Sequence, residues 1–447
     1  MSQSGSAVQV VSIGSADDGQ VCTLNIDALR KILTNDKIKD RKISVISIAG
    51  AMRTGKSFML DFFLRYLDAR YVKHDINDWI GDENSALTGF NWHGGVDRVT
   101  SGIMVWSEMF TYDEVNGEKI AILLMDTQGV FDSHSTVLDN TVIFAMGTLI
   151  SSHLIYNIKG NLQENDLQNL QLFTEYGKQA AKATGQKPFQ HLTFLIRDWG
   201  AAKDAPFGAE GGKIILDKLV KPHFMQKKEL KDVREHIKSC FEKLNCYLMM
   251  HPGLDLTEDQ DSDGKISDIR PKFVEQLKDF VPRIFAPENL ILKKINGRVI
   301  TSAELFNYFV PYIDIFNSGK IPKPTTILDA ISKADHLTAA EAGFTSYFSK
   351  FTEISGDFNN IEELDAVHAS NKKEAVEKFK ADLKFPNEST HEYEGKLVKK
   401  CDELFSSVRE KAVKQFLQNE GPIEAGIVAS WFEEVIKIFQ RLVDDVI

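Results

Sequence analysis

Residues 50–57 constrain the fold of this chain more than any other stretch. They read Gly-Ala-Met-Arg-Thr-Gly-Lys-Ser and fit the phosphate-loop pattern G-x-x-x-x-G-K-[ST] at every required position. The preceding residues 43–49 are β-branched and apolar, as in a buried parallel strand, and "KSFMLDFFLRYL" has helical spacing. A glycine-containing loop between a strand and a helix predicts an α/β nucleotide-binding domain.

Five further apolar runs predict strands in the first part of the chain. They are residues 103–110, 119–126, 153–158, 191–198 and 245–252. Helical stretches such as "LQNLQLFTEYGKQAAKAT" separate several of them. This alternation predicts a doubly wound α/β fold with a mostly parallel sheet.

The sequence changes character near "NSGKIPKPTT", where prolines and a glycine lie in a polar stretch. We predict a first domain over residues 1–317, including the N-terminal segment, and a linker over 318–325. Apolar residues at spacings of three and four then predict an α-helical bundle of the three-helix type over 326–418.

Residues 419–447 form a separate C-terminal amphipathic tail. One helical face carries Trp431, Val435, Ile438, Leu442 and Val446. Acidic residues outnumber basic ones on this segment, which makes it a poor anchor for an anionic membrane. We expect a helix that packs on the bundle or on a partner.

Overall charge and cysteine content limit the class of protein. The net charge of −11 argues against nucleic acid as a partner, because phosphate-backbone binding requires a basic face. The four cysteines are far apart and form no C-x-x-C pair, which predicts reduced, buried cysteines in a cytosolic setting. We find no signal-peptide pattern and no apolar run of the roughly 18 residues that a membrane span needs.

The phosphate loop assigns chemistry to particular side chains. Lys56 is expected to reach the β- and γ-phosphates, and the Ser57 hydroxyl to bind Mg²⁺. Asp126 opens a D-x-x-G pattern in which it supports the Mg²⁺ shell, while the N–H of Gly129 senses the γ-phosphate. Between the two motifs, Thr100 and Ser101 offer hydroxyls near the metal, and an ordinary loop threonine is the alternative for Thr100.

The sequence motifs predict the identity of the nucleotide base less directly than they predict phosphate binding. No N-K-x-D tetrad, the usual guanine reader of Ras-type GTPases, follows the predicted strand 191–198. Instead Arg197 and Asp198 end that strand, and the Asp198 carboxylate can accept from the paired donors of guanine. An ion pair between the two residues is the alternative, so the spacing favours guanine over adenine without deciding it.

Several ordered motifs resemble the atlastins, GTPases of the dynamin superfamily. They are "GAMRTGKSFMLDFFLRYL", "HDINDWIGDENSALTGFNWHGG", "DTQGVFDSHSTV", "QENDLQNLQLFTEYGKQA", "FLIRDWG", "LMMHPGL" and "KADHLTAAEA". Guanylate-binding proteins share the phosphate-loop arginine and the strand-end Arg-Asp. The resemblance covers about residues 20–415 and implies a Ras-like G domain followed by the helical bundle.

The resemblance also implies GTP as substrate, GDP as product and Mg²⁺ as cofactor. It places Thr100 in the first switch, residues 126–129 in the second, and the loop 251–254 near the base. It implies a nucleotide-dependent homodimer through the G domains, after which the bundle swings about the linker and pulls two membranes together. Such GTPases tether and fuse endoplasmic reticulum membranes from the cytosolic face.

Two features depart from the family pattern. His93 stands where family members usually carry an arginine at the G-domain interface, which puts dimer strength in question. No transmembrane hairpin follows the bundle in this sequence, so we expect membrane attachment through a region not in this chain. Two alternatives stay open: a guanylate-binding-protein-like GTPase that polymerises on membranes, or a nucleotide-gated tether without fusion.

Arg53 is an unusual residue for a loop that is generally built from small side chains. Val130 and Phe131 follow Gly129, so the glutamine that positions water in Ras-type enzymes is missing. Arg53 can instead offset the charge that develops on the transferred phosphoryl group, as an arginine finger in cis. A solvent-exposed or salt-bridged arginine is the alternative.

These arguments give one set of site residues. The predicted nucleotide-binding residues are Gly50, Arg53, Thr54, Gly55, Lys56, Ser57, Phe58, Arg197 and Asp198. The predicted catalytic residues are Arg53, Thr100, Ser101 and Gly129, and the predicted Mg²⁺ ligands are Ser57, Thr100 and Asp126.

Overall fold

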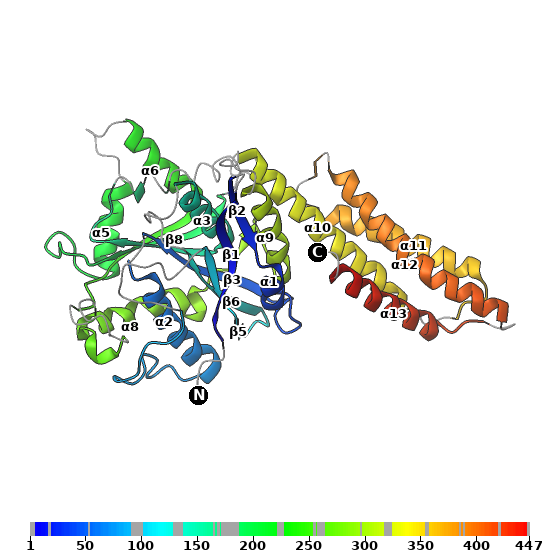
Figure 1. Cartoon of the computed structure of the whole chain (residues 1–447), viewed down its shortest axis with the longest axis horizontal. Coiled ribbons are helices and arrows are strands. Elements are labelled where there is room, and N and C mark those ends of the chain that lie inside the picture. Colours follow the sequence, from blue (N-terminus) through cyan, green and yellow to red (C-terminus); the bar gives the residue numbers. More distant parts are fainter. Residues whose placement is uncertain are drawn as a thin grey trace. The chain divides into compact units, whose positions relative to one another are not determined.

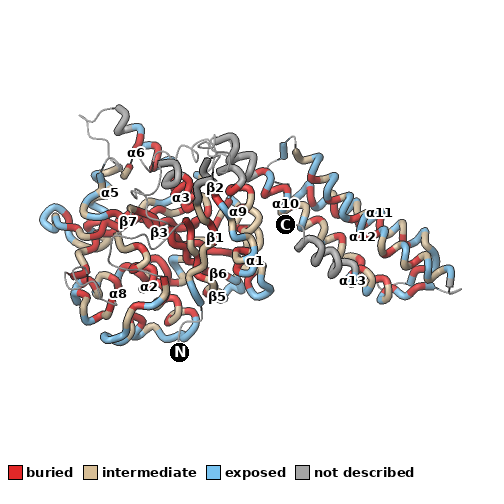
Figure 2. Tube along the Cα trace, viewed as in Figure 1, coloured by how far each residue is buried: buried red, intermediate tan, exposed pale blue. Residues whose placement is uncertain are grey.

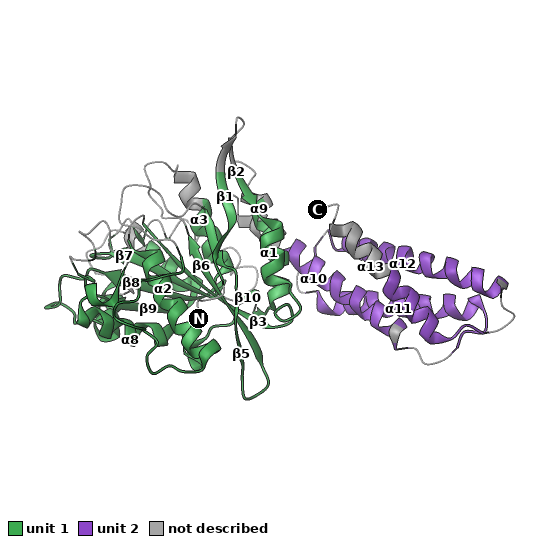
Figure 3. Cartoon of the chain, turned by 60° about the horizontal axis from the view of Figure 1, so that its bottom comes forward, with its two compact units in different colours: residues 1–328 green, residues 329–447 purple. Residues whose placement is uncertain are grey.

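The structure is a computed structural model of the chain. It describes residues 5–16, 19–51, 54–90, 102–127, 137–163, 166–167, 170, 187–220, 228–253, 256, 264–295, 297–316, 324–353, 357–383, 386–387, 389–418 and 422–444. These residues form two compact units, which divide the chain into 1–328 and 329–447 (Figure 3). Helix α10 (Pro324–Thr352) contains the division, so residues 324–325 of the predicted linker are helical.

The first unit is built around one nine-stranded sheet. Its strand order is β2-β1-β4-β6-β3-β7-β8-β9, with β5 paired to β6. The strands are β1 (Ala7–Ala16), β2 (Gly19–Leu24), β3 (Lys42–Gly50), β4 (Ile103–Trp106), β5 (Phe110–Asp113), β6 (Lys119–Thr127), β7 (His153–Lys159), β8 (Phe189–Arg197) and β9 (Phe241–Leu248). Strands β6, β3, β7, β8 and β9 run parallel, which confirms the predicted mostly parallel sheet.

Helices cover both faces of this sheet (Figure 1). Helix α2 (Lys56–Leu67) and helix α8 (Pro271–Phe285) lie together on one face, whereas α1 (Ile26–Leu33), α3 (Val137–Ile150) and α9 (Ser302–Phe316) lie on the other. Helices α5 (Ala209–Val220) and α6 (Lys228–Cys240) contact the edge strand β9. The shorter elements are the π-helix η1 (Asp68–Lys73), the 3-10 helices η2 (Ile266–Asp268) and η3 (Pro287–Asn289), and the hairpin strands β10 (Lys294–Ile295) and β11 (Arg298–Val299). This arrangement is the predicted doubly wound α/β fold.

The central strand β3 shows why the sequence folds this way. All of its residues except Lys42 are buried, because helices cover both of its faces (Figure 2). Ile46 and Ile48 belong to the apolar cluster that contains α2 and α8, while Val45 points to the opposite face. A strand buried on both faces needs a continuous apolar run, which is the pattern of residues 43–49.

The described strands also correct several sequence-based expectations. The single strand predicted over 103–110 is wrong: it is two strands, β4 and β5, each pairing with a different part of β6. The strand predicted at 245–252 is β9, which begins at Phe241 and ends at Leu248. The antiparallel hairpin of β1 and β2 was not predicted from the sequence.

The second unit contains α10, α11 (Ile361–Asp382), α12 (Thr390–Gln418) and α13 (Ala425–Asp444). Helix α13 comes from the predicted tail and packs on the bundle. The Phe432 ring is fully buried and stacks on Phe351 of α10, with ring centroids 4.1 Å apart. A reciprocal backbone pair between Phe358 and Ile423 fixes the start of this segment.

A polar network, buried at Tyr347 and His368 and half-exposed at Asp402, joins three helices of the second unit. The Tyr347 hydroxyl of α10 lies 2.7 Å from Nδ1 of His368 in α11. The other ring nitrogen of His368 lies 2.9 Å from a carboxylate oxygen of Asp402 in α12, and Phe405 stacks on the imidazole. Because buried polar groups need partners, these hydrogen bonds favour one alignment of the three helices along their axes.

Two further observations concern the whole described chain. All four cysteines are buried and none of them forms a disulfide, as predicted. Among the described helices, none has the length and apolar character needed to cross a bilayer.

Removing the Phe432 ring tests whether the C-terminal helix belongs to the core of the second unit. We expect Phe432→Ala to lower the unfolding free energy of this unit by about 3–5 kcal/mol, since a buried aromatic side chain is replaced by a cavity. Native-state hydrogen exchange of amides in α11 and α12 measures the change. Leu417→Ala, at a side chain that is 82% exposed, is the control and should change it by less than about 0.5 kcal/mol. Equal effects of the two substitutions would contradict the packing argument.

Candidate nucleotide-binding site

Four parallel strands end at the same edge of the sheet. β3 ends at Gly50, β6 carries Asp126 next to its last residue, β7 ends just after Asn157, and β8 ends at Arg197. Because these strands are parallel neighbours, their carboxyl ends meet at one edge. In open α/β sheets this edge is where ligands bind.

Gly50 begins the phosphate loop at a point of close backbone approach. A Cβ atom built on this residue would lie 2.1 Å from the backbone oxygen of Asn157 in β7. That distance is far inside van der Waals contact, so any side chain would push the two strand ends apart. The first glycine of the motif therefore has a steric reason in this fold.

The second glycine, Gly55, is the N-cap of α2 and adopts a left-handed conformation with φ of 76°. Thr54 stabilises the turn before it, because its hydroxyl donates to the backbone oxygen of Ala51 at 2.8 Å. The loop therefore closes on itself and delivers the chain into the helix, whose N-terminus favours anions.

Lys56 lies inside the loop. Its ammonium donates to the backbone oxygen of Ala51 at 3.1 Å, and the residue is only 7% exposed. Burial lowers the pKa of Lys56, and the negative charge of Asp126 opposes this shift. A buried cation with a carbonyl partner is ready to bind a phosphate group.

Ser57 and Asp126 come together from α2 and β6. The Ser57 hydroxyl donates to a carboxylate oxygen of Asp126 at 2.6 Å, and Asp126 is 1% exposed. Thr127, the next residue, ties β6 to β3 by donating to the backbone oxygen of Ile48. Hydroxyl and carboxylate oxygens are the ligands that Mg²⁺ prefers, so the donor set fits this metal.

Arg197 is placed differently from a simple base-reading residue. Its guanidinium lies over the rings of Phe58 and Phe273, 5.9 Å and 5.4 Å from their centroids. It donates over 3.4 Å and 3.5 Å to the backbone oxygens of Thr54 and Gly55. Burial lowers the pKa of Arg197 to about 10, against the opposing charge of Asp198. Phe58, predicted to bind nucleotide, has its side chain in the core beneath this guanidinium.

Asp198 has features that suit recognition of a ligand. Its backbone is left-handed, with φ of 59°, which is uncommon for a non-glycine residue. One carboxylate oxygen lies 3.8 Å from the ammonium of Lys159, while the other is buried and has no hydrogen-bond partner within the described residues. A buried acceptor without a donor is costly unless a ligand supplies one.

Two residues of α2 that sequence reasoning missed connect the loop to residues 80–90. Asp61 is fully buried and accepts the N–H of Phe90 at 2.7 Å; burial raises the pKa of Asp61 to about 8. Arg65, one turn further, donates to the backbone oxygens of Ile80, Ser85 and Ala86. Ser57, Asp61 and Arg65 are four residues apart, so they share one face of the helix.

Asn157 was also missed. Its side-chain amide nitrogen donates to the backbone oxygen of Thr54 at 2.8 Å and to the Thr54 hydroxyl at 3.0 Å. The available signal was a polar residue near the carboxyl end of an apolar run, the same signal that identified Asp126.

Several predicted residues cannot be compared with the structure. Arg53, Thr100, Ser101 and Gly129 lie outside the described residues, and so does His93.

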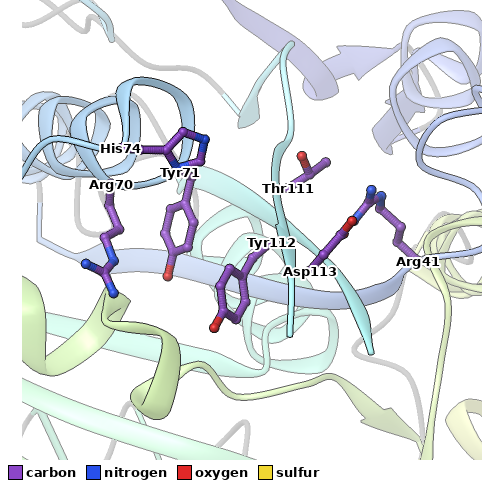
Figure 4. Close-up of a pocket in the computed structure, with 7 residues that line it drawn as sticks. All are labelled: Arg41, Arg70, Tyr71, His74, Thr111, Tyr112 and Asp113. Carbon is purple, nitrogen blue, oxygen red and sulfur yellow. The ribbon is translucent and has the colours of Figure 1, made fainter. Parts of the chain in front are cut away.

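A separate cavity of about 430 Å³ opens elsewhere in the first unit (Figure 4). It is lined by Arg41, Arg70 and Asp113 among others, and Arg41 is paired with Asp113. Asp113 lies beside the first residue of β6, at the opposite end of that strand from Asp126. In Figure 4 the Arg70 guanidinium points away from the Arg41–Asp113 pair. The cavity therefore does not belong to the nucleotide edge.

Comparison with known proteins finds relatives of this chain. Residues 19–294 match the family described as "Guanylate-binding protein, N-terminal domain". The chain is 44% identical to atlastin of Drosophila melanogaster over 407 residues, which cover 90% of this chain and 75% of the relative. It is 42% identical to atlastin-1 of Bos taurus over 386 residues, covering 86% and 68% of the two chains. It is also 42% identical to human atlastin-2 over 395 residues, covering 88% and 67%.

The first unit therefore contains a GTPase domain of the guanylate-binding-protein type, and the similarity to atlastins continues into the second unit. The chain belongs to the atlastin family of GTPases.

Proposed function

We propose that this edge of the sheet binds GTP together with Mg²⁺ and hydrolyses it to GDP by attack of water on the γ-phosphate. The observation that carries the proposal is the meeting of Ser57 and Asp126 at 2.6 Å beside the buried ammonium of Lys56. Positioning and charge neutralisation, without a covalent intermediate, supply the rate acceleration.

Ser57 and Asp126 would hold Mg²⁺, with Thr100 as the further ligand from the first switch. When bound, the ion neutralises charge on the β- and γ-phosphates. Lys56 adds a second positive charge from the opposite side of the loop. The N–H of Gly129 would sense the γ-phosphate, and Ser101 belongs with Thr100 to the proposed catalytic residues.

Asp198 selects guanine. Its partnerless buried oxygen and the oxygen near Lys159 together can accept the two neighbouring donors on the Watson–Crick edge of guanine. Adenine does not present this donor pair, so it would leave the buried carboxylate unsatisfied.

Arg53 supplies charge to the transition state in cis. The segment after Gly129 offers valine and phenylalanine in place of a water-positioning glutamine. An arginine rooted in the phosphate loop can reach the transferred phosphoryl group without a second protein.

The family membership supports a larger cycle. GTP binding drives homodimerisation through the first unit, the helical bundle rearranges, and endoplasmic reticulum membranes are tethered and fused from their cytosolic face. Two alternatives are an assembling GTPase like the guanylate-binding proteins, and a tether that holds membranes without fusing them.

Base selection by Asp198 can be tested by exchanging its hydrogen-bond character. Asp198→Asn should lose about 3 kcal/mol of GDP affinity, roughly 100-fold, because an acceptor is replaced by a donor. The same variant should gain affinity for xanthosine diphosphate, which carries a carbonyl where guanine has its amino group. Titration with both nucleotides measures the exchange, and the exposed Asp204→Asn is the matched control. Unchanged preference for GDP would exclude Asp198 as the base reader.

Catalysis by Arg53 predicts a separation of binding from turnover. Arg53→Ala should bind GTP with nearly normal affinity but hydrolyse it roughly 10³-fold more slowly or worse, the scale of an arginine finger. Single-turnover hydrolysis and analogue binding measure the two quantities. Arg70→Ala, which removes an arginine of the separate cavity, should leave both unchanged. Normal turnover of Arg53→Ala would refute the role.

The dimer predicts a change of mass with nucleotide. We expect a monomer with GDP and a dimer with a non-hydrolysable GTP analogue or a transition-state mimic, measured by light scattering after size exclusion. Lys56→Ala, which weakens phosphate binding, is the control and should remain monomeric. A monomer with GDP, with the GTP analogue and with the transition-state mimic would contradict the dimer mechanism, and His93 would then be the first residue to test. Larger assemblies would support the guanylate-binding-protein-like alternative.

A further inference from the structure

Asn157 approaches the phosphate loop twice. Its backbone oxygen limits Gly50 to glycine, and its side-chain nitrogen donates to both oxygens of Thr54. The Thr54 hydroxyl gives its own proton to Ala51, so it can only accept from Asn157. The amide nitrogen of Asn157 must therefore face the loop.

The orientation of this amide is maintained at a cost. Asn157 is 1% exposed, and within the described part of the chain its side-chain oxygen has no hydrogen-bond partner. A buried acceptor without a partner is unfavourable by about 1–3 kcal/mol. The two hydrogen bonds that the Asn157 side chain donates to Thr54 offset this unfavourable term.

Arg197 acts on the same peptide groups from the next strand. Its guanidinium donates to the backbone oxygens of Thr54 and Gly55, and it is buried against the rings of Phe58 and Phe273. The Gly55 oxygen also accepts the N–H of Met59 as part of the helix. The Thr54 carbonyl therefore points toward Asn157 and Arg197, and the Gly55 carbonyl points toward Arg197 and the N–H of Met59.

Because peptide groups are planar, the directions of the Thr54 and Gly55 carbonyls fix the directions of the N–H groups that follow them. In a trans peptide the carbonyl of one residue and the N–H of the next point in opposite directions, and the described chain contains no cis peptide bond. Holding the Thr54 carbonyl therefore directs the Gly55 N–H away from Asn157 and Arg197. Holding the Gly55 carbonyl does the same for the Lys56 N–H. These N–H groups are donors of the kind that a phosphate loop offers to its ligand.

We propose that Asn157 and Arg197 are positioning residues that orient the N–H groups of Gly55 and Lys56 toward the nucleotide phosphates. The inference rests on the proposed nucleotide site and assigns to Asn157 a role that the loop motif does not contain. It also gives Arg197 a task distinct from base reading. Arg197 positions the phosphate end while its neighbour Asp198 reads the base, so two adjacent residues serve both ends of the ligand.

The test separates the phosphate end from the base end by comparing GDP with guanosine, which has the base but no phosphate. Asn157→Asp keeps the side-chain size, removes both donors and places negative charge beside the loop. We expect GDP affinity to fall roughly 10-fold or more, and guanosine affinity to change less than about twofold. Asn157→Ala removes the donors without adding charge and should show a smaller loss in the same direction.

Asn116→Asp is the matched control, because Asn116 lies in an exposed turn and its side-chain oxygen already acts as an acceptor. It adds the same charge and should leave both affinities unchanged. Equal losses for GDP and guanosine in both Asn157 variants would overturn the inference, since they indicate general damage to the fold. Unchanged GDP affinity would also overturn it. If the unaltered chain failed to bind GDP more tightly than guanosine, the proposed nucleotide site itself would be wrong.

Discussion

The contact between Gly50 and the backbone of Asn157 is the constraint on which the nucleotide site depends. It brings the ends of β3 and β7 so close that only a hydrogen atom fits between them. The loop must therefore leave the sheet at this point, and the neighbouring strand ends supply the groups around it. Lys56, Ser57 and Gly55 occupy positions set by the sheet, and the motif residues alone would not fix them.

Burial of charge is the second property of this edge. Lys56, Arg197 and Asp126 are each less than 10% exposed, and burial lowers the pKa of both cations. Removing such groups from water is unfavourable, and the packed α/β core around them offsets the loss. An anionic ligand with a metal would add oppositely charged partners to those that these groups already have, so binding would offset part of the unfavourable free energy of burying them.

The sequence predicted the parallel core well because β3, β6, β7 and β8 are buried on both faces and therefore read as apolar runs. It missed the hairpin of β1 and β2, since the run 7–16 mixes glycine and serine with apolar residues and its partner β2 lies at the sheet edge. It extended β4 to Phe110 because Met109 and Phe110 continue the apolar run, although Ser107–Met109 interrupt the pairing with β6. Asp61 and Arg65 were missed because their roles depend on contacts with residues far along the chain, which no local pattern encodes. Asn157 carried the same local signal as Asp126, a polar residue near the end of an apolar run, but that signal does not encode its contact with Thr54.

The charge balance of the protein explains why composition says little about its ligand. A net charge of −11 would repel a polyanion if all charges acted equally. Charges on the surface are screened by water and salt within about 10 Å, whereas charges in a low-dielectric interior are not. Lys56 and Arg197 lie inside, at 7% and 5% exposure, while most acidic residues lie outside. The local field at the phosphate loop is therefore set by a few buried groups, and an acidic chain can bind a highly charged nucleotide.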